Sequence, residues 1–360
     1  MSILDKQFTP RPKRRSRRRL YIIPGIVVIL VAALFLFTNV GNDVAFVGHF
    51  MTPPQHFTYS GQSDYISAVA WSRDGKRIAS ASGDHTAQVW DAGNGGHVLT
   101  YRGHSADVLA LAWSPNGQYI ATGSLDNTVQ VWNPINGATL YTYRGHSDAI
   151  FDLAWSPDSK RIASVSNDGT VQMWDALTGQ HVVTYTGPTS LRGGTAASNA
   201  ASWSADGQYL AIGGVGPAIL ISTATAKVVG YYGPPGGESH AVAFSPDGTY
   251  LAVGRDDTTV EVWNVATHTN VYTYNGHTGD IFTLAWSPDG KRIASGGADA
   301  TVQVWDALNG GHEYTYRGHL DYYWGHFTSG QEVDTLAWSP DGKQIASGGT
   351  DNTVQVWQAK

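Results

Sequence analysis

A unit of about 42 residues recurs seven times between Trp71 and Trp357, and this repetition limits the possible folds more than any other feature. The clearest copies are AWSPDGKRIASGGADATVQVWDALNG at 285–310 and AWSPDGKQIASGGTDNTVQVWQA at 337–359. The aromatic residue that opens each copy stands at Trp71, Trp113, Trp155, Trp203, Phe244, Trp286 and Trp338, at intervals of 42, 42, 48, 41, 42 and 52 residues. A period of this length predicts an array of small supersecondary units.

Each unit predicts four short strands joined by tight turns. Pro-Asp-Gly follows the opening Ala-Trp-Ser, and there proline presets the first φ of a turn while glycine accepts a positive φ. An apolar stretch such as 292–295, an Asp-x-Thr turn and a β-branched run such as 301–305 come next. A four-stranded sheet of this size cannot bury both faces alone, so we expect an all-β fold of seven units packed in a closed ring.

The ends of the repeat array predict how the ring closes. Only three residues follow Trp357, so the last unit lacks a fourth strand. The segment QHFTYSG at 55–61 matches the fourth-strand segments HVLTYRG at 97–103 and NVYTYNG at 270–276. We therefore expect residues 55–60 to complete the last unit, which removes two open sheet edges.

Two dipeptides recur at fixed places in these units. Gly-His precedes the first strand at 103–104, 145–146, 276–277 and 318–319, and Trp-Asp ends the third strand at 90–91, 174–175 and 305–306. The chain resembles the WD-repeat β-propeller family over residues 55–360. The resemblance implies a seven-bladed β-propeller of four-stranded antiparallel blades. It also implies a role as an interaction platform, although fold alone does not determine function.

The resemblance implies a role for the histidines as well. In this family the Gly-His histidine hydrogen-bonds a strand Ser or Thr and a turn Asp, and the third-strand Trp completes the network. The matching sets here are His104, Thr122, Asp126 and Trp132; His146, Ser164, Asp168 and Trp174; His277, Ser295, Asp299 and Trp305; and His319, Ser347, Asp351 and Trp357. A Ser-His-Asp set repeated around a ring indicates architecture, because a nucleophile needs one exposed oxygen beside one oxyanion site.

Three units depart from this pattern. The first has Gln62 in place of histidine, and Gln62 could still donate to Asp84. The fourth has Ile212, Gly216 and Ser222 where Ser, Asp and Trp are expected, and the fifth has Val253 and Pro235, with His240 five residues late. We expect blades four and five to be less tightly bonded, with more mobile loops. Either these units have drifted, or their loops are free to bind another molecule.

The N-terminal residues have a different composition. Seven Lys or Arg residues lie within 11–19, and the stretch from Leu20 to Val40 carries no charge. At about 1.5 Å per residue, 21 helical residues span roughly 31 Å, enough to cross a bilayer. We expect a basic cytoplasmic tail at 1–19, a transmembrane helix at 20–40 and a linker at 41–54, with the propeller across the membrane. A cleaved signal peptide is the competing interpretation.

Charge and composition exclude several functions. The net charge of −6 divides into +7 for residues 1–40 (8 Lys/Arg, 1 Asp) and −13 for 41–360 (15 Lys/Arg, 28 Asp/Glu). An acidic propeller is a poor partner for phosphate backbones, so nucleic-acid binding is disfavoured. The chain has no cysteine, which excludes disulfides and thiolate metal sites. It also lacks an Asn-x-Ser/Thr sequon, and together these absences favour a bacterial, membrane-anchored member of the family.

Candidate binding residues lie on the face that carries the inter-blade loops. Two of these loops are lengthened, at 187–200 and 318–333. The second contains Tyr322, Tyr323, Trp324, His326 and Phe327, and aromatic residues are typical of interface hot spots. The alternative is that they cap the central channel. Acidic residues at similar loop positions would favour a basic partner: Asp64, Asp107, Asp148 and Asp280.

These patterns favour a non-enzymatic, membrane-tethered scaffold that binds a protein or peptide through its inter-blade loop face. The sequence lacks HExxH, GxSxG and GxxxxGK[ST], so we expect no catalytic residue, cofactor or metal. The alternative function is a glycan or small-ligand binder that uses the aromatic loop 320–331 or the central channel.

Overall fold

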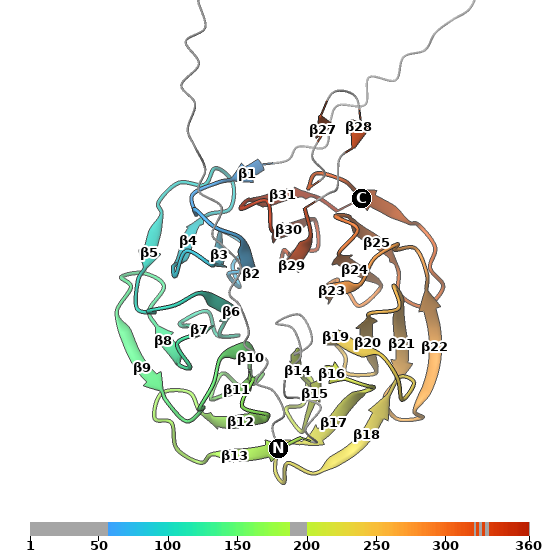
Figure 1. Cartoon of the computed structure of the whole chain (residues 1–360), viewed down its shortest axis with the longest axis horizontal. Coiled ribbons are helices and arrows are strands. Elements are labelled where there is room, and N and C mark those ends of the chain that lie inside the picture. Colours follow the sequence, from blue (N-terminus) through green and yellow to red (C-terminus); the bar gives the residue numbers. More distant parts are fainter. Residues whose placement is uncertain (1–56, 188–199, 320–321, 324–325, 328–330, 360) are drawn as a thin grey trace, which may run out of the picture. The chain divides into compact units, whose positions relative to one another are not determined.

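The computed structural model describes residues 57–187, 200–319, 322–323, 326–327 and 331–359. These residues form seven blades arranged as a ring (Figure 1). Residues of all seven blades line a central channel. The predicted all-β, seven-bladed propeller of four-stranded antiparallel blades is confirmed. Within the described ranges no helix is long and apolar enough to span a membrane. The expected tail, transmembrane helix and linker at 1–54 lie outside the described residues.

The first three blades follow the repeat without interruption. Blade one contains β2 (Ile66–Trp71), β3 (Arg77–Ser82), β4 (Ala87–Asp91) and β5 (Leu99–Tyr101). Blade two contains β6 (Val108–Trp113), β7 (Ile120–Ser124), β8 (Val129–Trp132) and β9 (Thr139–Tyr143). Blade three contains β10 (Ile150–Trp155), β11 (Arg161–Ser166), β12 (Thr170–Asp175) and β13 (Val183–Thr186).

Blades four and five share an extra pairing. Blade four contains β14 (Ala201–Trp203), β15 (Tyr209–Ile212), β17 (Ala218–Ser222) and β18 (Val228–Tyr232). Blade five contains β19 (Glu238–Phe244), β20 (Tyr250–Arg255), β21 (Val260–Asn264) and β22 (Thr269–Tyr274). The short strand β16 (Gly214–Val215) leaves blade four and pairs with β19. These two blades are therefore joined by backbone hydrogen bonds as well as by side chains.

The lengthened loop 318–333 connects the last two blades. Blade six contains β23 (Ile281–Trp286), β24 (Arg292–Gly297), β25 (Val302–Asp306) and β26 (Tyr314–Tyr316). Blade seven contains β29 (Val333–Trp338), β30 (Gln344–Gly349) and β31 (Val354–Gln358). Between β26 and β29, strands β27 (Tyr322–Tyr323) and β28 (His326–Phe327) pair with each other in a sheet of their own.

The ring closes through the N-terminal strand β1 (Phe57–Tyr59), which is the fourth strand of blade seven. Phe57 lies opposite Val356 and Tyr59 lies opposite Val354. This confirms the expected closure, although residues 55 and 56 lie outside the described range. The closure also joins blade seven to blade one, because the Tyr59 ring stacks on Trp90 with centroids 4.3 Å apart.

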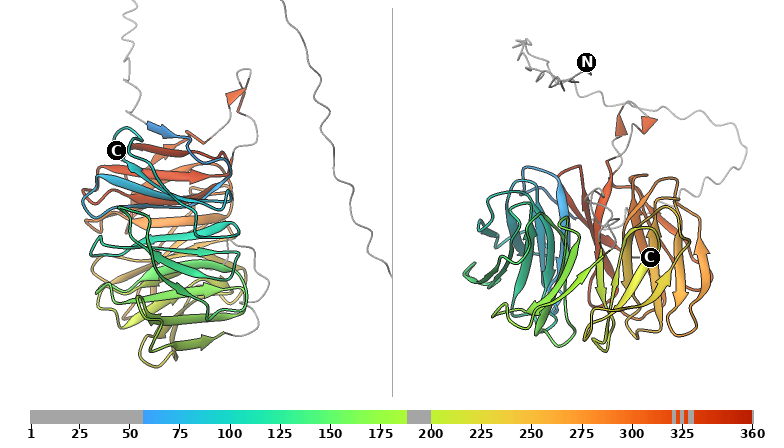
Figure 2. Two further views of the ribbon diagram at one scale, coloured as in Figure 1. Left: turned by 90° about the vertical axis from the view of Figure 1, so that its left-hand side faces the viewer. Right: turned by 60° about the horizontal axis from the view of Figure 1, so that its bottom comes forward.

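Neighbouring blades are held together by their opening tryptophans. In Figure 2 the blades are seen from the side, one packed against the next. Five indole N–H groups donate to an alanine carbonyl of the preceding blade at 3.0–3.1 Å, from Trp71, Trp155, Trp203, Trp286 and Trp338. Each of these rings is buried as well. One side chain thus supplies both apolar burial and a directional bond to the neighbouring blade.

The innermost strands are not regular. In six blades the pairing of the first and second strands shifts by one residue, which marks a β-bulge. The bulged residues are Ser67, Leu109, Phe151, His240, Phe282 and Asp334. A bulge commonly redirects a side chain. All six of these residues line the central channel.

We predict that deletion of residues 55–60 opens the ring. The deletion exposes an edge of β31 and removes the Tyr59 contact with blade one, so the variant should melt at lower temperature and aggregate. Light scattering and a melting curve measure both effects. Tyr59→Ala should also lower the melting temperature, whereas the exposed neighbour Thr58→Ala should change it little. A deletion variant that stays monomeric and melts like the parent would contradict the closure.

Candidate functional site

The structure brings all four expected histidine networks together. In each network the histidine Nδ1 lies 2.7–2.9 Å from the aspartate Oδ2, and Nε2 lies 2.8–2.9 Å from the Ser or Thr oxygen. The indole N–H of the matching tryptophan donates to the same hydroxyl at 3.2–3.3 Å. The four histidine side chains are completely buried. Each hydroxyl is therefore inaccessible to a substrate.

The electrostatics of these networks fit a structural role. Burial alone would favour the protonated carboxyl of Asp299, but hydrogen bonds from His277, Thr278 and Thr301 outweigh it and lower the pKa of Asp299 to about 2. The pKa of Asp168 is lowered in the same way, while burial lowers the pKa of its partner His146. The aspartates are thus ionised acceptors that fix the inter-blade loops.

The first blade differs from the expectation for Gln62. The Gln62 amide donates to the backbone oxygen of Thr86 at 3.3 Å, and its Oε1 accepts from Ser80 at 2.6 Å. Asp84 instead accepts from the backbone of Ser63 at 3.0 Å. The expected Gln62–Asp84 bond was wrong, because both ends of the amide are used by blade-one groups nearer the core.

In blade four the connection between the second and third strands is one residue shorter than in the regular blades, so the residue at the tryptophan position differs from the expected one. Tyr209 lies opposite Ser222 and Leu210 lies opposite Ile221, whereas the equivalent Ile162 lies opposite Trp174. Ile221, not Ser222, therefore occupies the tryptophan position. The repeat in the sequence did not show this shift, because the register is fixed by the pairing of β15 with β17. Ile221 is completely buried, so an apolar side chain replaces the indole in the core.

Blade five has its own polar network in place of the histidine set. The side chain of Arg255 is 1% exposed and donates to Ser239 at 3.3 Å and to the backbone oxygen of Gly236. Its Nε lies 3.6 Å from Asp257. Trp263 donates to Glu261 at 3.0 Å, so this indole has a partner on its own strand. The sequence analysis expected blade five to be less tightly bonded, and it did not consider Arg255. The fold buries this cation in blade five, where it has several polar partners.

A second inter-blade network was missed by the sequence analysis. A fourth-strand tyrosine stacks on the third-strand tryptophan of the next blade, with ring centroids 4.2–4.5 Å apart, and its hydroxyl donates to the third-strand glutamine. The pairs are Tyr59–Gln88, Tyr101–Gln130, Tyr143–Gln172, Tyr274–Gln303 and Tyr316–Gln355. The signal in the sequence was the Thr-Tyr pair of the fourth strand and the glutamine of the third strand, which recur at the same places in these units.

This network explains the glycine of each Gly-His pair. The glutamine amide that accepts the tyrosine hydroxyl also donates to the glycine carbonyl, at 3.1 Å in the case of Gln130 and Gly103. A Cβ on Gly103 would clash with Gln130 and with Tyr101. The glycine is therefore required by packing against the neighbouring blade, and not by a turn.

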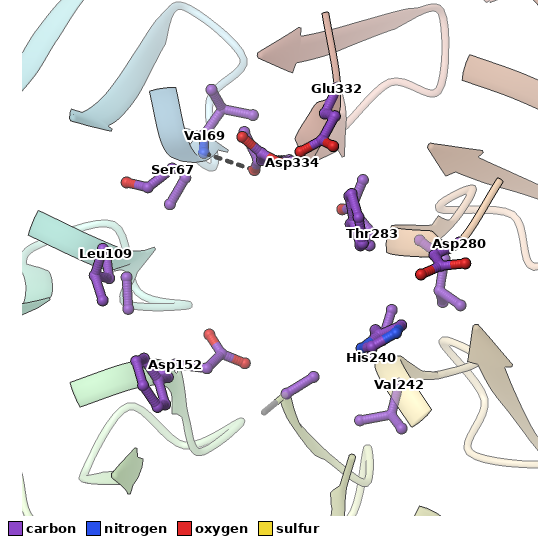
Figure 3. Close-up of a pocket in the computed structure, with 18 of the residues that line it drawn as sticks. Ser67, Val69, Leu109, Asp152, His240, Val242, Asp280, Thr283, Glu332 and Asp334 are labelled. Carbon is purple, nitrogen blue, oxygen red and sulfur yellow. Dashed lines mark hydrogen bonds between the residues drawn. The ribbon is translucent and has the colours of Figure 1, made fainter. Parts of the chain in front are cut away.

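A cavity of about 970 Å³ occupies the channel at the inter-blade loop face. Figure 3 shows part of its wall, to which all seven blades contribute residues. Six acidic residues line it: Asp152, Glu238, Asp256, Asp280, Glu332 and Asp334. No lysine or arginine lies among the described lining residues. The described part of the wall therefore concentrates acidic groups with no Lys or Arg side chain among them.

Two of these carboxyl groups have strongly raised pKa values. Burial raises the pKa of Asp152 to about 7, although this group accepts backbone hydrogen bonds from Ala201 at 2.7 Å and Leu153 at 2.8 Å. Burial and the negative charges of Glu332 and Asp351 raise the pKa of Asp334 to about 7. Perturbed carboxyl groups in a cleft are typical of functional sites.

His240 is the bulged residue of blade five, and not a displaced member of the Gly-His pattern. Its ring projects into the cavity (Figure 3). The residue is 6% exposed, and neither ring nitrogen has a hydrogen-bond partner. The nearest carboxylate is that of Glu238, at 3.8 Å from Nδ1, which is too long for a hydrogen bond. The ring edge packs against Phe282, with centroids 5.8 Å apart.

The expected loop-face acids occupy two different positions. Asp107, Asp280 and Glu332 immediately precede a first strand, and Glu238 is the first residue of β19. Asp64 and Asp148 come two residues before their strands, so the expected equivalence of all four was wrong. Asp280 lines the cavity, whereas Asp107 accepts from the Tyr65 hydroxyl at 3.0 Å and Asp148 accepts from Asn167 at 2.9 Å.

The expected aromatic site can be placed only in part. Tyr322 lies opposite Phe327 and Tyr323 lies opposite His326 in the β27–β28 pair. Trp324 lies outside the described residues. Residues 188–199 of the other lengthened loop, 187–200, also lie outside them. The loop thus contains a short hairpin that the sequence analysis did not predict.

Comparison with known families agrees with the geometry. A family model described as the first beta-propeller of IFT122 matches residues 66–232. A family model described as WD domain, G-beta repeat matches 231–264, 268–306 and 312–358. The chain belongs to the WD-repeat β-propeller family, whose members commonly act as protein-interaction scaffolds. No curated protein is similar enough to match the chain.

We predict that Ser295→Ala destabilises the fold. The change leaves the buried His277 and Trp305 nitrogens without their shared partner and should lower the free energy of unfolding by about 1–3 kcal/mol. Chemical denaturation measures this change. His97→Ala is the matched control, because it removes a His–Asp pair whose histidine is 87% exposed, and it should stay within about 0.5 kcal/mol of the parent. Equal losses in both variants would refute the structural role of the buried network.

We predict that Asp334→Asn stabilises the protein above neutral pH. The pKa of Asp334 is about 7 when folded and about 3.9 when unfolded, so the folded state binds more protons between these values. Stability from this group therefore falls as pH rises from about 4 to 7. At about pH 8 the variant should melt roughly 2–4 °C above the parent. At about pH 4 the variant and the parent should melt at the same temperature.

The matched control for this experiment is Asp341→Asn on the opposite face. Its hydrogen bond from Ser339 lowers the pKa of Asp341, so ionisation of this group favours the folded state. Asp341→Asn should not raise the melting temperature at about pH 8. An Asp334 variant with the same melting temperature as the parent at every pH would contradict the raised pKa.

Proposed function

We propose that this protein is a non-enzymatic scaffold, tethered to a membrane by residues 20–40, that holds a protein or peptide partner on the inter-blade loop face of its propeller. In this proposal the basic tail at 1–19 is cytoplasmic and the propeller lies on the outer side of the membrane. The charge distribution of the N-terminal residues supports the tether and its orientation.

The difference between the two faces of the ring is the observation that carries this proposal. On one face, each first-to-second-strand turn forms the same internal bond, in which Ser72, Ser114, Ser156, Ser204, Ser245, Ser287 or Ser339 donates to an Asp or Asn two residues later at 2.6–2.7 Å. Those turns satisfy their own polar groups. The other face carries the variable loops, the β27–β28 hairpin and the acidic cavity.

Variable loops on a rigid ring suit recognition. The propeller fixes the ends of each loop through inter-blade bonds, so a partner does not have to order the whole surface when it binds. Aromatic residues such as Tyr322, Tyr323 and Phe327 supply contact area at low cost in side-chain entropy. The negative charge of the face favours a partner with a basic surface.

Burial of the repeated Ser-His-Asp sets supports a non-enzymatic role. The hydroxyl of Ser164, for example, is completely buried and already bonded to His146 and Trp174. A nucleophile requires an accessible oxygen and a neighbouring oxyanion site, and a group enclosed between blades offers neither.

We predict that the full chain, crosslinked in its own membrane, captures specific proteins through the aromatic loop. A variant with Tyr322, Tyr323, Trp324 and Phe327 changed to Ala should lose at least about tenfold in capture, as expected when several hot-spot aromatics are removed. Mass spectrometry of the crosslinked products measures the loss. The matched control is Val98→Ala and Leu140→Ala, which truncates two exposed apolar residues, one directly before β5 and one in β9. Equal capture by the aromatic variant and the parent would remove this loop from the proposal.

A further inference from the structure

The channel cavity carries an electrostatic imbalance that the fold does not require. Its six acids come from the edge of blades three, five, six and seven, and the wall supplies no described cation to pair with them. Elsewhere the ring pairs its buried charges, as in the four His–Asp networks and at Arg255. Grouped carboxylates in a partly enclosed space attract a cation, because low-dielectric walls focus their field. Burial is the largest cause of the raised pKa of Asp334, and the negative charges of Glu332 and Asp351 raise it further.

His240 indicates which kind of cation fits the cavity. A buried polar side chain without a hydrogen-bond partner costs free energy, so most such groups have one. Both His240 nitrogens lack a protein partner although the ring faces the open cavity (Figure 3). A neutral imidazole has one acceptor nitrogen and one N–H. It can therefore accept a hydrogen bond from a ligand N–H group. Within the described ranges no group of three or more His, Asp or Glu side chains is placed to hold a metal ion, so an N–H donor fits this ring better.

The remaining wall residues favour an organic ligand. Phe151 and Phe282 occupy the bulge positions of blades three and six, and both line the cavity. Aliphatic residues such as Leu109 and Val242 complete the wall. A mixed wall of this kind contacts a methylene chain through its apolar groups, while carboxylates and aromatic faces attract a terminal ammonium.

We infer that the channel cavity binds the primary ammonium group of an unbranched alkylamine, which donates a hydrogen bond to His240 and is attracted by the carboxylates of the surrounding wall. The same chemistry is offered by a free aliphatic diamine and by the lysine side chain of a partner. The inference goes beyond the proposed scaffold function, because a free amine can occupy the channel whether or not a protein binds the aromatic loop.

The test is calorimetric titration of the full chain, purified in a non-ionic detergent, at fixed ionic strength. The probes are 1,5-diaminopentane, Nα-acetyl-lysine N-methylamide and the neutral pentane-1,5-diol. We expect both amines to bind and the diol not to bind. Tighter binding of the diamine would identify a free amine as the source, and equal or tighter binding of the lysine amide would identify a partner side chain.

Three variants locate the site. His240→Phe keeps an aromatic ring but removes the acceptor nitrogen, and Asp334→Asn removes one charge while it should raise stability. His240→Phe should weaken amine binding about tenfold, the effect of one charge-assisted hydrogen bond. Asp334→Asn should also weaken it, because the wall loses one negative charge. Asp341→Asn makes the same charge change on the opposite face and should bind like the parent. The inference is overturned if the amines bind no better than the diol, or if the His240 and Asp334 variants retain parental affinity.

Discussion

The contact between neighbouring blades is the constraint on which this structure depends. A single four-stranded blade cannot bury both of its faces, so every blade is completed by the next one. The repeated tyrosine of the fourth strand supplies much of that contact, because it stacks on the tryptophan of the following blade and bonds its glutamine. Strand β1 brings the same tyrosine, Tyr59, to Trp90 and Gln88. Closure of the ring is therefore one more copy of the contact that joins every regular pair of blades.

The irregular blades show what happens where this contact is altered. Ile221 takes the place of a tryptophan in blade four, and Tyr232 meets Trp263 edge-on with ring centroids 6.1 Å apart, instead of stacking on it. The pairing of β16 with β19 adds backbone hydrogen bonds across the same junction. In blade five the buried Arg255 donates hydrogen bonds to the backbone oxygen of Gly236 and to the hydroxyl of Ser239. The junction of blades four and five is thus held by a different set of bonds from the regular junctions.

The bulged first strands connect the fold to its candidate chemistry. A regular strand alternates its side chains between the two faces of a blade, and one inserted residue changes the direction of its neighbours. The bulge residues therefore face the channel in six blades, and their identities vary from serine to phenylalanine, histidine and aspartate. Variation at one structurally equivalent position allows a symmetric ring to enclose an asymmetric site.

The sequence by itself determined the number of blades, their strand order, the closure by the N-terminal strand and the residues of the four histidine networks. The blades, their strand order and the closure follow from segments that repeat at fixed spacing, because turn chemistry and residue periodicity are encoded in neighbouring positions. The residues of the histidine networks followed from the resemblance to the WD-repeat family. Only the tertiary structure decided that Ile221 takes the tryptophan position, that Gln62 does not reach Asp84, and that His240 faces the channel beside carboxylates from other blades. Register shifts and contacts across the ring join residues far apart in the chain, and no local pattern specifies which of them meet.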